Sequence, residues 1–217
     1  MILSKHDRIV FAGDSVTDMG SVNPVGEGFM EELGRSYVHV VDALLSAVYP
    51  DLYIQVTNSG VSGNNSRDLL NRFDRDVLNL NPDWISICIG INDVWRQFDC
   101  PSIPHRHVSL EEYERNMESM ISRAVEKAKG VFVMTPYYME PNPADTMRAR
   151  MEEYCDVCRR LAKKYGATLI DLQKIFADYC TVRHSTYVAW DRVHPNQTGA
   201  TLIALAFLKE IGFEIGF

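Results

Sequence analysis

Short apolar runs alternate with longer amphipathic stretches along the chain. Runs of this length, mostly without strict alternation, are typical of strands that are buried on both faces of a sheet. The five clearest runs are Arg8–Ala12, Leu52–Thr57, Trp84–Gly90, Val131–Thr135 and Ala167–Leu172. We therefore expect five buried β-strands, distributed from near the N-terminus to residue 172.

The stretches between these runs carry apolar residues at helical spacing. The clearest are Tyr37–Val48, Leu110–Ala128, Ala144–Tyr165 and Thr198–Ile211. Ser109 and Glu112 form a capping box before the second stretch, and Gly166 directly follows the third, as a C-terminal glycine should. Helices between strands imply right-handed crossovers and a parallel sheet covered on both faces. With no internal repeat and no linker, the pattern predicts one α/β domain over residues 1–217 around a five-stranded parallel sheet.

The charge balance excludes several classes of partner. The 22 basic and 29 acidic residues give a net charge of −7, and no basic patch offsets it, which argues against nucleic-acid binding. No apolar run approaches the roughly 20 residues that cross a bilayer. Charged residues precede the only N-terminal apolar run, Ile9–Gly13, so no signal-peptide core is present. We expect a cytoplasmic protein that binds neither nucleic acid nor membrane.

The cysteines and histidines do not suggest a metal site. Five scattered cysteines fit reduced thiols in a cytosolic compartment better than a disulfide framework. Cys155 and Cys158 have redox or metal spacing but stand alone inside a helical pattern, so we interpret them as structural. His105 and His107, with Cys100 nearby, lack a third local ligand and are typical of a polar loop. We expect no metal and no cofactor.

Polar residues follow the predicted strands where the strands end. Gly13–Ser15 follows the first strand, Asn58–Asn64 the second and Gly90–Asp93 the third, while Asp191–Pro195 precedes the last helix. In parallel α/β sheets, function gathers at the carboxyl ends of the strands. Each block alone is explained by a turn or a helix cap. The four blocks together, in this order, are far more specific.

Together the four blocks resemble the signature of the SGNH hydrolases, also called the GDSL esterase family, whose name lists Ser, Gly, Asn and His. Ser15, Gly63, Asn92 and His194 match these positions in family order across almost the whole chain. Val16 stands where the family name has Leu, at a position that packs rather than reacts. No Gly-x-Ser-x-Gly motif is present, which argues against the larger α/β-hydrolase fold. The resemblance implies a three-layer α/β/α, flavodoxin-like fold.

The resemblance also implies a role for each matching residue. Ser15 is the expected nucleophile and His194 its base, since an imidazole with a pKa of about 6.5 can take and return a proton at neutral pH. Asp191 lies three residues earlier, so one short turn can set its carboxylate against Nδ1 of the imidazole. The N–H groups of Ser15 and Gly63 and the side-chain amide of Asn92 are the expected oxyanion donors.

Four further residues near these blocks are candidates for substrate contact: Asp14, Trp95, Tyr137 and Trp190. For the three aromatic residues, sugar stacking and packing in the core or an interface are equally open interpretations. Asp14 is also explained as a turn or helix cap. The segment Gly20–Gly28 lacks the Lys and Ser/Thr of a P-loop, so we expect a flexible lip over the site rather than a phosphate cradle.

Longer stretches around the blocks resemble the intracellular bacterial acetylxylan esterases. These stretches are Val61–Leu69, Pro82–Phe98 and Ala189–Pro195. The resemblance implies a serine esterase that removes acetyl groups from carbohydrate esters such as acetylated xylo-oligosaccharides, through an acyl-enzyme on Ser15. A short-chain carboxylesterase or lysophospholipase-type acyl hydrolase is the alternative within enzymes. A carbohydrate-binding relic of the same fold is the alternative outside them.

The resemblance suggests homo-oligomers as well. Two segments are candidate interface surfaces, the aromatic-rich Tyr179–Trp190 and the apolar tail Ile211–Phe217. The expected partners are therefore a small-molecule ester substrate and further copies of the chain.

Overall fold

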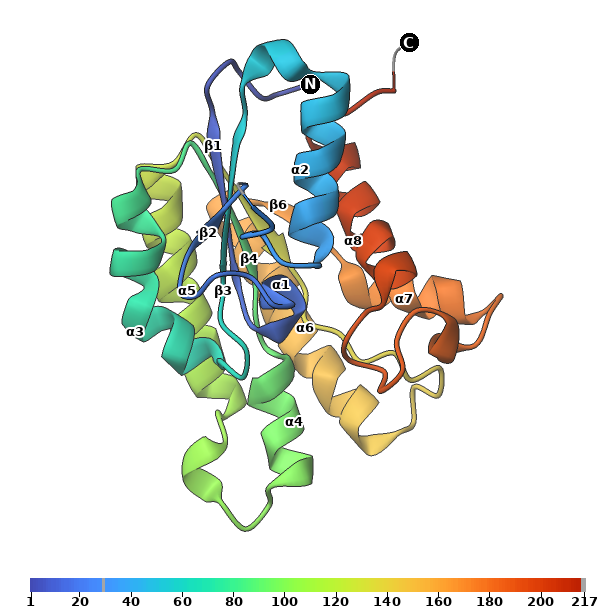
Figure 1. The fold of residues 1–217 in the computed structure, drawn as a ribbon. Helices are drawn as coiled ribbons and strands as arrows, with labels where there is room; N and C mark the ends of the chain where they lie inside the picture. The colour runs from blue at the N-terminus through green and yellow to red at the C-terminus, as the bar shows by residue number, and fades with distance from the viewer. Residues whose placement is uncertain (29, 216–217) are drawn as a thin grey trace.

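A six-stranded sheet runs through the centre of the molecule (Figure 1). The structure is a computed structural model that describes residues 1–28 and 30–215. The strands are β1 (Arg8–Gly13), β2 (Gly26–Glu27), β3 (Gln55–Gly60), β4 (Trp84–Cys88), β5 (Gly130–Met134) and β6 (Thr168–Ile170). They lie in the order β2-β3-β1-β4-β5-β6, and every pair in this sheet is parallel except the antiparallel pair β2–β3.

The five predicted strands are all present, but the predicted strand number is wrong. The sixth strand, β2, lies at the sheet edge within Gly20–Gly28, where we expected a flexible lip. Two residues are too few to show a strand periodicity. Strand β3 begins at Gln55 rather than Leu52, because Pro50–Leu52 forms a 3₁₀ turn. Leu172 likewise leaves the predicted fifth strand and begins a helix.

Eight α-helices are present in the described residues. They are α1 (Ser15–Asp18), α2 (Tyr37–Val48), α3 (Ser66–Asp76), α4 (Ile91–Asp99), α5 (Leu110–Lys127), α6 (Thr146–Tyr165), α7 (Leu172–Cys180) and α8 (Gln197–Glu210). The four predicted helices correspond to α2, α5, α6 and α8, with ends that agree within two residues. The shorter helices α1, α3, α4 and α7 were not predicted.

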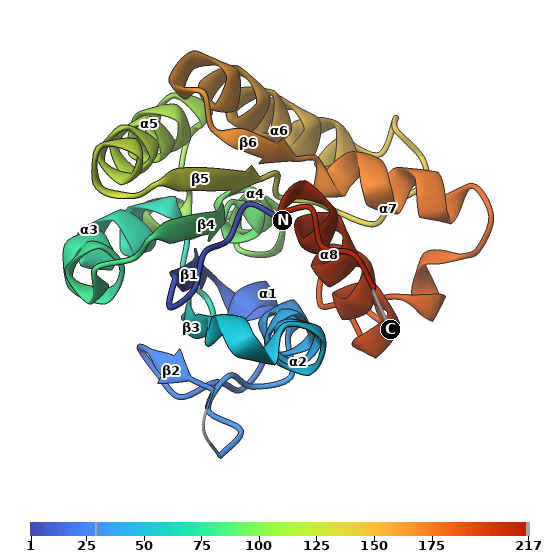
Figure 2. The same ribbon diagram turned by 90° about the horizontal axis from the view of Figure 1, so that it is seen from above.

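The strands divide their side chains between two cores, one on each face of the sheet. In β1, Val10 and Ala12 belong to the core beneath α3, α5 and α6, whereas Ile9 and Phe11 belong to the core beneath α2 and α8. This alternation follows from the period-2 geometry of a strand. Figure 2 shows the helices covering both faces of the sheet. The predicted three-layer α/β/α architecture is therefore confirmed.

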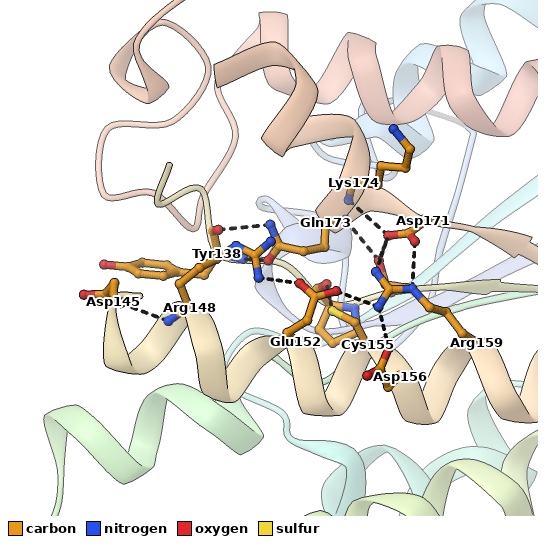
Figure 3. A network of polar contacts seen from close by, with 12 residues as sticks. Tyr138, Asp145, Arg148, Glu152, Cys155, Asp156, Arg159, Asp171, Gln173 and Lys174 are labelled. Carbon is orange, nitrogen blue, oxygen red and sulfur yellow. Dashed lines mark hydrogen bonds and ion pairs between the residues drawn. The ribbon is translucent and has the colours of Figure 1, made fainter. Parts of the chain in front are cut away.

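A polar network ties α6 to the beginning of α7 (Figure 3). Arg159 of α6 binds Asp171 through its Nε, 2.8 Å from Oδ2, and also pairs with Glu152 and Asp156 on its own helix. Asp171 in turn caps α7 by accepting a hydrogen bond from the backbone N–H of Lys174. Gln173, two residues after Asp171, holds the segment between β5 and α6 at Tyr138. The end of β6, α6 and the β5–α6 connection are thus fixed to one another.

One predicted interface segment reaches the end of the chain. Residues 216 and 217 of the predicted interface tail Ile211–Phe217 lie outside the described residues. Over residues 1–28 and 30–215, no helix combines the length and the hydropathy that a membrane crossing requires.

Candidate active site

Three strand ends lie in register at the carboxyl edge of the sheet. Gly13, the last residue of β1, pairs with Gly60 of β3 on one side and with Cys88 of β4 on the other. The connections that follow these strands therefore leave the sheet side by side. They carry Ser15, Gly63 and Asn92, the residues predicted from the blocks. The sheet topology thus brings together positions that are widely separated in sequence.

A tight turn between β1 and α1 sets the position of Ser15. A Cβ atom at Gly13 would lie 2.2 Å from Thr17 Oγ1 and 2.6 Å from the Cys88 carbonyl oxygen, so only glycine fits there. Asp14 is the N-cap of α1 and accepts a hydrogen bond of 2.9 Å from the N–H of Val16. Ser15 is consequently the first residue of α1, half-buried at the edge of the sheet.

Ser15, His194 and Asp191 form a continuous hydrogen-bonded relay. Ser15 Oγ lies 2.9 Å from His194 Nε2, and His194 Nδ1 lies 2.5 Å from Asp191 Oδ2. With the proton on Nδ1 donated to Asp191, Nε2 is left to accept the hydroxyl proton of Ser15. This is the arrangement in which an imidazole can act as general base for a serine.

The carboxylate of Asp191 is held by its own loop. Its Oδ1 accepts hydrogen bonds from the backbone N–H groups of Val193, at 3.0 Å, and of His194, at 2.7 Å. Partial burial raises the pKa of Asp191, but the hydrogen bonds to His194 and Val193 outweigh this and bring the pKa below its usual value. Asp191 is therefore ionised at neutral pH and can stabilise an imidazolium during the reaction.

The loop that carries Gly63 is tied to α1 by Asp18. Gly63 has a φ of +83°, in the left-handed region that favours glycine. The preceding residue, Ser62, donates to the Asp18 carboxylate from its N–H at 3.1 Å and from its hydroxyl at 2.5 Å. The same carboxylate accepts from the N–H and hydroxyl of Ser21 and from the amide of Asn23, so the start of the Gly20–Gly28 segment is held as well.

Asn92 is joined to the same loop from α4. Its Nδ2 donates to the carbonyl oxygen of Asn64, at 2.9 Å, and its Oδ1 accepts from a guanidinium nitrogen of Arg96, at 3.0 Å. Because an arginine donates only, this contact sets which end of the amide carries the N–H groups. Gly63 and Asn92 are thus linked through a single intervening residue, on the connections that flank Ser15.

A buried arginine connects three parts of the site. Arg72 of α3 donates to the carbonyl oxygens of Gly13, at 3.0 Å, and Ser59, at 2.9 Å, and to Asn64 Oδ1, at 2.7 Å. Burial lowers the pKa of Arg72, and its ion pair with Asp76 opposes this. Sequence reasoning missed Arg72, Asp18 and Arg96. A charged residue beside Phe73 on the apolar face of a helix was the available signal for Arg72.

The four substrate candidates lie in different environments. Asp14 is 1% exposed and Tyr137 is 2% exposed, so a bound sugar cannot touch them, and these two expectations are wrong. Asp14 caps α1, and Tyr137 packs against Phe176 with ring centroids 4.6 Å apart. Trp95 lies beside the imidazole of His194, with ring centroids 6.1 Å apart. Trp190 is 89% exposed and precedes Asp191.

Two fully buried carboxylates lie behind the site. Burial raises the pKa of Asp14 and of Asp93 to about 7 in each case. Asp93 accepts from the N–H of Ser66 at 3.0 Å and from its hydroxyl at 2.5 Å, which lowers the pKa without cancelling the effect of burial. These groups support the site from within and have no exposed surface for substrate.

Matches to known proteins extend over nearly the whole chain. The sequence profile of the GDSL-like lipase/acylhydrolase family matches residues 11–202. The acetylxylan esterase of Geobacillus stearothermophilus is 44% identical over 214 residues, which are 99% of this chain and 98% of that protein. The crystal structure of that enzyme, Axe2, has a TM-score of 0.97 at 44% identity and covers 100% of this chain and 99% of the other.

Further solved structures agree with these matches. LAE5, described as an α/β hydrolase enzyme from the metagenome of Lake Arreo, Spain, is 43% identical with a TM-score of 0.94, and 98% of each chain is covered. Structures of Axe2 include three catalytic mutants, S15A, D191A and H194A, each with a TM-score of 0.97 at 43% identity over 100% of this chain and 99% of the other. The chain belongs to the GDSL-like lipase/acylhydrolase family.

Proposed function

We propose that the protein is a serine esterase that removes acetyl groups from carbohydrate esters, and specifically from acetylated xylo-oligosaccharides. The observation that carries this proposal is the relay of Ser15, His194 and Asp191 at the edge of the sheet, flanked by Gly63 and Asn92. The same three residue types are substituted in the catalytic mutants of Axe2, an acetylxylan esterase that matches this chain over its full length. The chain is proposed to fold as a single hydrolase domain over residues 1–217.

The reaction proceeds in two transfers of the acetyl group. Ser15 Oγ attacks the acetyl carbonyl carbon while His194 Nε2 takes the hydroxyl proton, and the oxyanion that forms is bound by the N–H groups of Ser15 and Gly63 and by Asn92 Nδ2. The bond to the sugar oxygen then breaks as His194 returns the proton to that oxygen. Water attacks the acetyl-serine, gives a proton to the imidazole, and releases acetate as the serine regains its hydrogen.

Two tryptophans support a sugar as the leaving group. Trp95 lies beside the imidazole of His194, which must reach the departing oxygen, and Trp190 is exposed next to Asp191 in the sequence. Aromatic faces stack on the apolar faces of sugar rings. Trp190 also fits an interface between copies of the chain, and the experiments below distinguish these roles.

The test is acetate release from acetylated xylo-oligosaccharides beside a series of 4-nitrophenyl esters from acetyl to octanoyl. Ser15→Ala is the control for catalysis by this site. We expect rapid release from the sugars, activity on the acetyl ester that falls steeply with chain length, and no activity in the variant. Activity that grows with chain length and spares the sugars would instead identify a general or lipid esterase. No turnover and no labelling of Ser15 by a serine-directed phosphonate would identify a binding relic.

We further propose that the protein acts in the cytoplasm as a homo-oligomer. Support for self-association comes from the segment Tyr179–Trp190, which exposes three large apolar side chains: Val182 at 84%, Tyr187 at 56% and Trp190 at 89%. Several large apolar side chains exposed within one short segment are a feature of interaction sites.

A further inference from the structure

The loop that carries the acid–base residues has an unusual backbone at Arg192. This residue lies between Asp191 and His194 with a φ of +66°, in the left-handed region that side chains other than glycine rarely adopt. Such a conformation persists where surrounding contacts determine it. The contacts of Arg192 therefore bear on how Asp191 and His194 are placed.

Two contacts from the β5–α6 connection hold Arg192. The backbone N–H of Met139 donates to the carbonyl oxygen of Arg192, at 2.9 Å. The guanidinium of Arg192 donates to the carboxylate of Glu140, whose side chain is only 11% exposed. Consecutive residues of one segment thus bind the backbone and the side chain of the same residue.

The segment that supplies these contacts is itself fixed. Gln173 of α7 accepts from the N–H of Tyr138, at 2.9 Å, and donates to its carbonyl oxygen, at 3.2 Å (Figure 3). The N–H of Gln173 donates to Thr135 Oγ1, at 3.1 Å, directly after β5. Met139 and Glu140 are therefore anchored to the end of the sheet, and Arg192 is anchored to them.

At the base of the loop, the segment that precedes it pairs with the segment that follows it. Ala189 and Pro195 form an isolated antiparallel bridge, and the N–H of Asn196 donates to the carbonyl oxygen of Val188, at 2.8 Å. Residues 190–194 project from this closure. Within this part Val193 is buried in the core and His194 is hydrogen-bonded to Ser15, and the contacts at Arg192 add to these restraints by fixing the backbone directly between Asp191 and Val193.

We propose that Glu140 and Arg192 form a clamp that holds the acid–base loop and so sets the position of His194 relative to Ser15. Both are positioning residues, because neither belongs to the hydrogen-bonded relay. The inference rests on the proposed esterase function, and it adds to that site a determinant, Glu140, that lies 52 residues from Arg192 in the sequence.

Direct electrostatic action of these charges is the competing explanation, and it predicts a different pattern. The imidazole faces Asp191 on its own loop, the hydroxyl of Ser15 on α1 and the ring of Trp95 on α4, on which the Arg96 guanidinium stacks. Removing the negative charge of Glu140 would favour the neutral imidazole, whereas removing the positive charge of Arg192 would favour the imidazolium. The acid limb of the pH–rate profile would then move in opposite directions in the two variants. If the two residues instead form a clamp, its loss weakens the hydrogen bond between His194 and Asp191 in both variants. The acid limb of the pH–rate profile then moves to lower pH in both.

The experiment compares Glu140→Gln, Arg192→Gly and the double variant with wild type on 4-nitrophenyl acetate. Glycine keeps the left-handed backbone free of strain while removing the guanidinium, and Arg192→Lys retains the charge. The controls are Glu114→Gln and Arg160→Gln, which break an exposed ion pair between α5 and α6. We expect each clamp variant to lower kcat about 10-fold with KM little changed, since a misplacement of reacting groups by about 1 Å can cost roughly 10²-fold and the relay itself stays intact. The double variant should lose no more than either single one, and Arg192→Lys should recover most of the rate.

The rate of phosphonate labelling of Ser15 is measured in parallel, because it needs no ester substrate. Labelling slowed in both clamp variants and unchanged in the controls supports the clamp even if acetylated sugars prove not to be the substrate. Any of three results would overturn the clamp. These are acid limbs of the pH–rate profiles that move in opposite directions in the two single variants, kcat losses that multiply in the double variant, and rates of the clamp variants equal to those of the controls.

Discussion

At the scale of single residues, Asn92 illustrates how one side chain serves two partners. Its amide is only 3% exposed, donates to the Asn64 carbonyl oxygen at 2.9 Å and accepts from Arg96 at 3.0 Å. The amide orientation is thus set before substrate arrives. Preorganised donors of this kind stabilise an oxyanion without rearranging during the reaction.

Replacing this amide gives the first prediction. We expect Asn92→Ala to fold normally and to lose roughly 10²–10³-fold in kcat, because removal of one oxyanion donor typically has that effect. The matched control is Asn71→Ala, which alters an exposed asparagine of α3. The measurements are kcat on 4-nitrophenyl acetate and thermal unfolding by circular dichroism. Wild-type turnover in the Asn92 variant would exclude the oxyanion role.

At the scale of elements, Asp18 shows how a four-residue helix positions a distant loop. The pKa of Asp18 is lowered, since the hydrogen bonds from Ser62, Ser21 and Asn23 outweigh the opposing effect of burial. The carboxylate therefore stabilises the fold above its ordinary pKa. This contribution is lost as the pH falls through the lowered value.

Asp18→Asn tests this connection between α1 and the Gly63 loop. An amide keeps one acceptor and loses the charge, so we expect a loss of about 2 kcal/mol in the free energy of unfolding at pH 7 and about a 10-fold fall in kcat. The variant should lose less stability than wild type on acidification to pH 3. Asp178→Asn, which breaks an exposed pair with Lys174, is the control. Unchanged kcat with the full loss of stability would restrict Asp18 to a structural role.

Some helices are predicted from the sequence pattern more readily than others, and α2 and α3 show why. The apolar positions Val38, Val41 and Leu45 of α2 face the core, so their spacing predicts the helix with its exact ends. The buried face of α3 instead includes Arg72 and Asp76, an ion pair that interrupts the apolar periodicity. Apolar spacing alone therefore indicates this helix less clearly, and the partners of Arg72, on β1, β3 and the loop after β3, come together only in the folded chain.

At the scale of the whole molecule, the buried carboxylates make stability depend on pH. The pKa of Asp93 is raised to about 7 in the folded state from an ordinary value near 3.8. The folded state therefore holds its proton more tightly than the unfolded state, and stability falls as the pH rises between these two values. Asp14 acts in the same direction.

Asp93→Asn, which mimics the neutral acid, tests this effect. We expect the melting temperature of the variant, relative to wild type, to rise between pH 5 and pH 8, because the variant has no buried charge to form. Differential scanning calorimetry at several pH values gives the measurement. A difference from wild type that is the same at pH 5 and pH 8 would contradict the assignment.

The exposed surface provides the last prediction, which concerns assembly. We expect light scattering to give a mass that is a multiple of 24.7 kDa for wild type, and a smaller multiple for Trp190→Ser. Met30→Ser, at another highly exposed apolar residue, should leave the mass unchanged. A Trp190 variant of unchanged mass that loses activity on oligosaccharides, but not on 4-nitrophenyl acetate, would assign Trp190 to sugar binding instead.

The sequence by itself determined the five longer strands and predicted which polar residues follow them, because both are local properties. Apolar runs identify buried strands. Short blocks in the order of the family signature contain Ser15, Gly63, Asn92, Asp191 and His194. The same information predicted the longer amphipathic helices. Local patterns of this kind need no knowledge of which distant segments meet.

Only the tertiary structure decided which of these residues touch and what holds them. The register of Gly13 with Gly60 and Cys88 sets three loops side by side, and burial removes Asp14 and Tyr137 from contact with substrate. The supports from Asp18, Arg72 and the pair Glu140–Arg192 likewise depend on segments far apart in the chain. Hydrogen bonds and ion pairs act over a few ångströms, so they exist only where the fold has already brought their partners together.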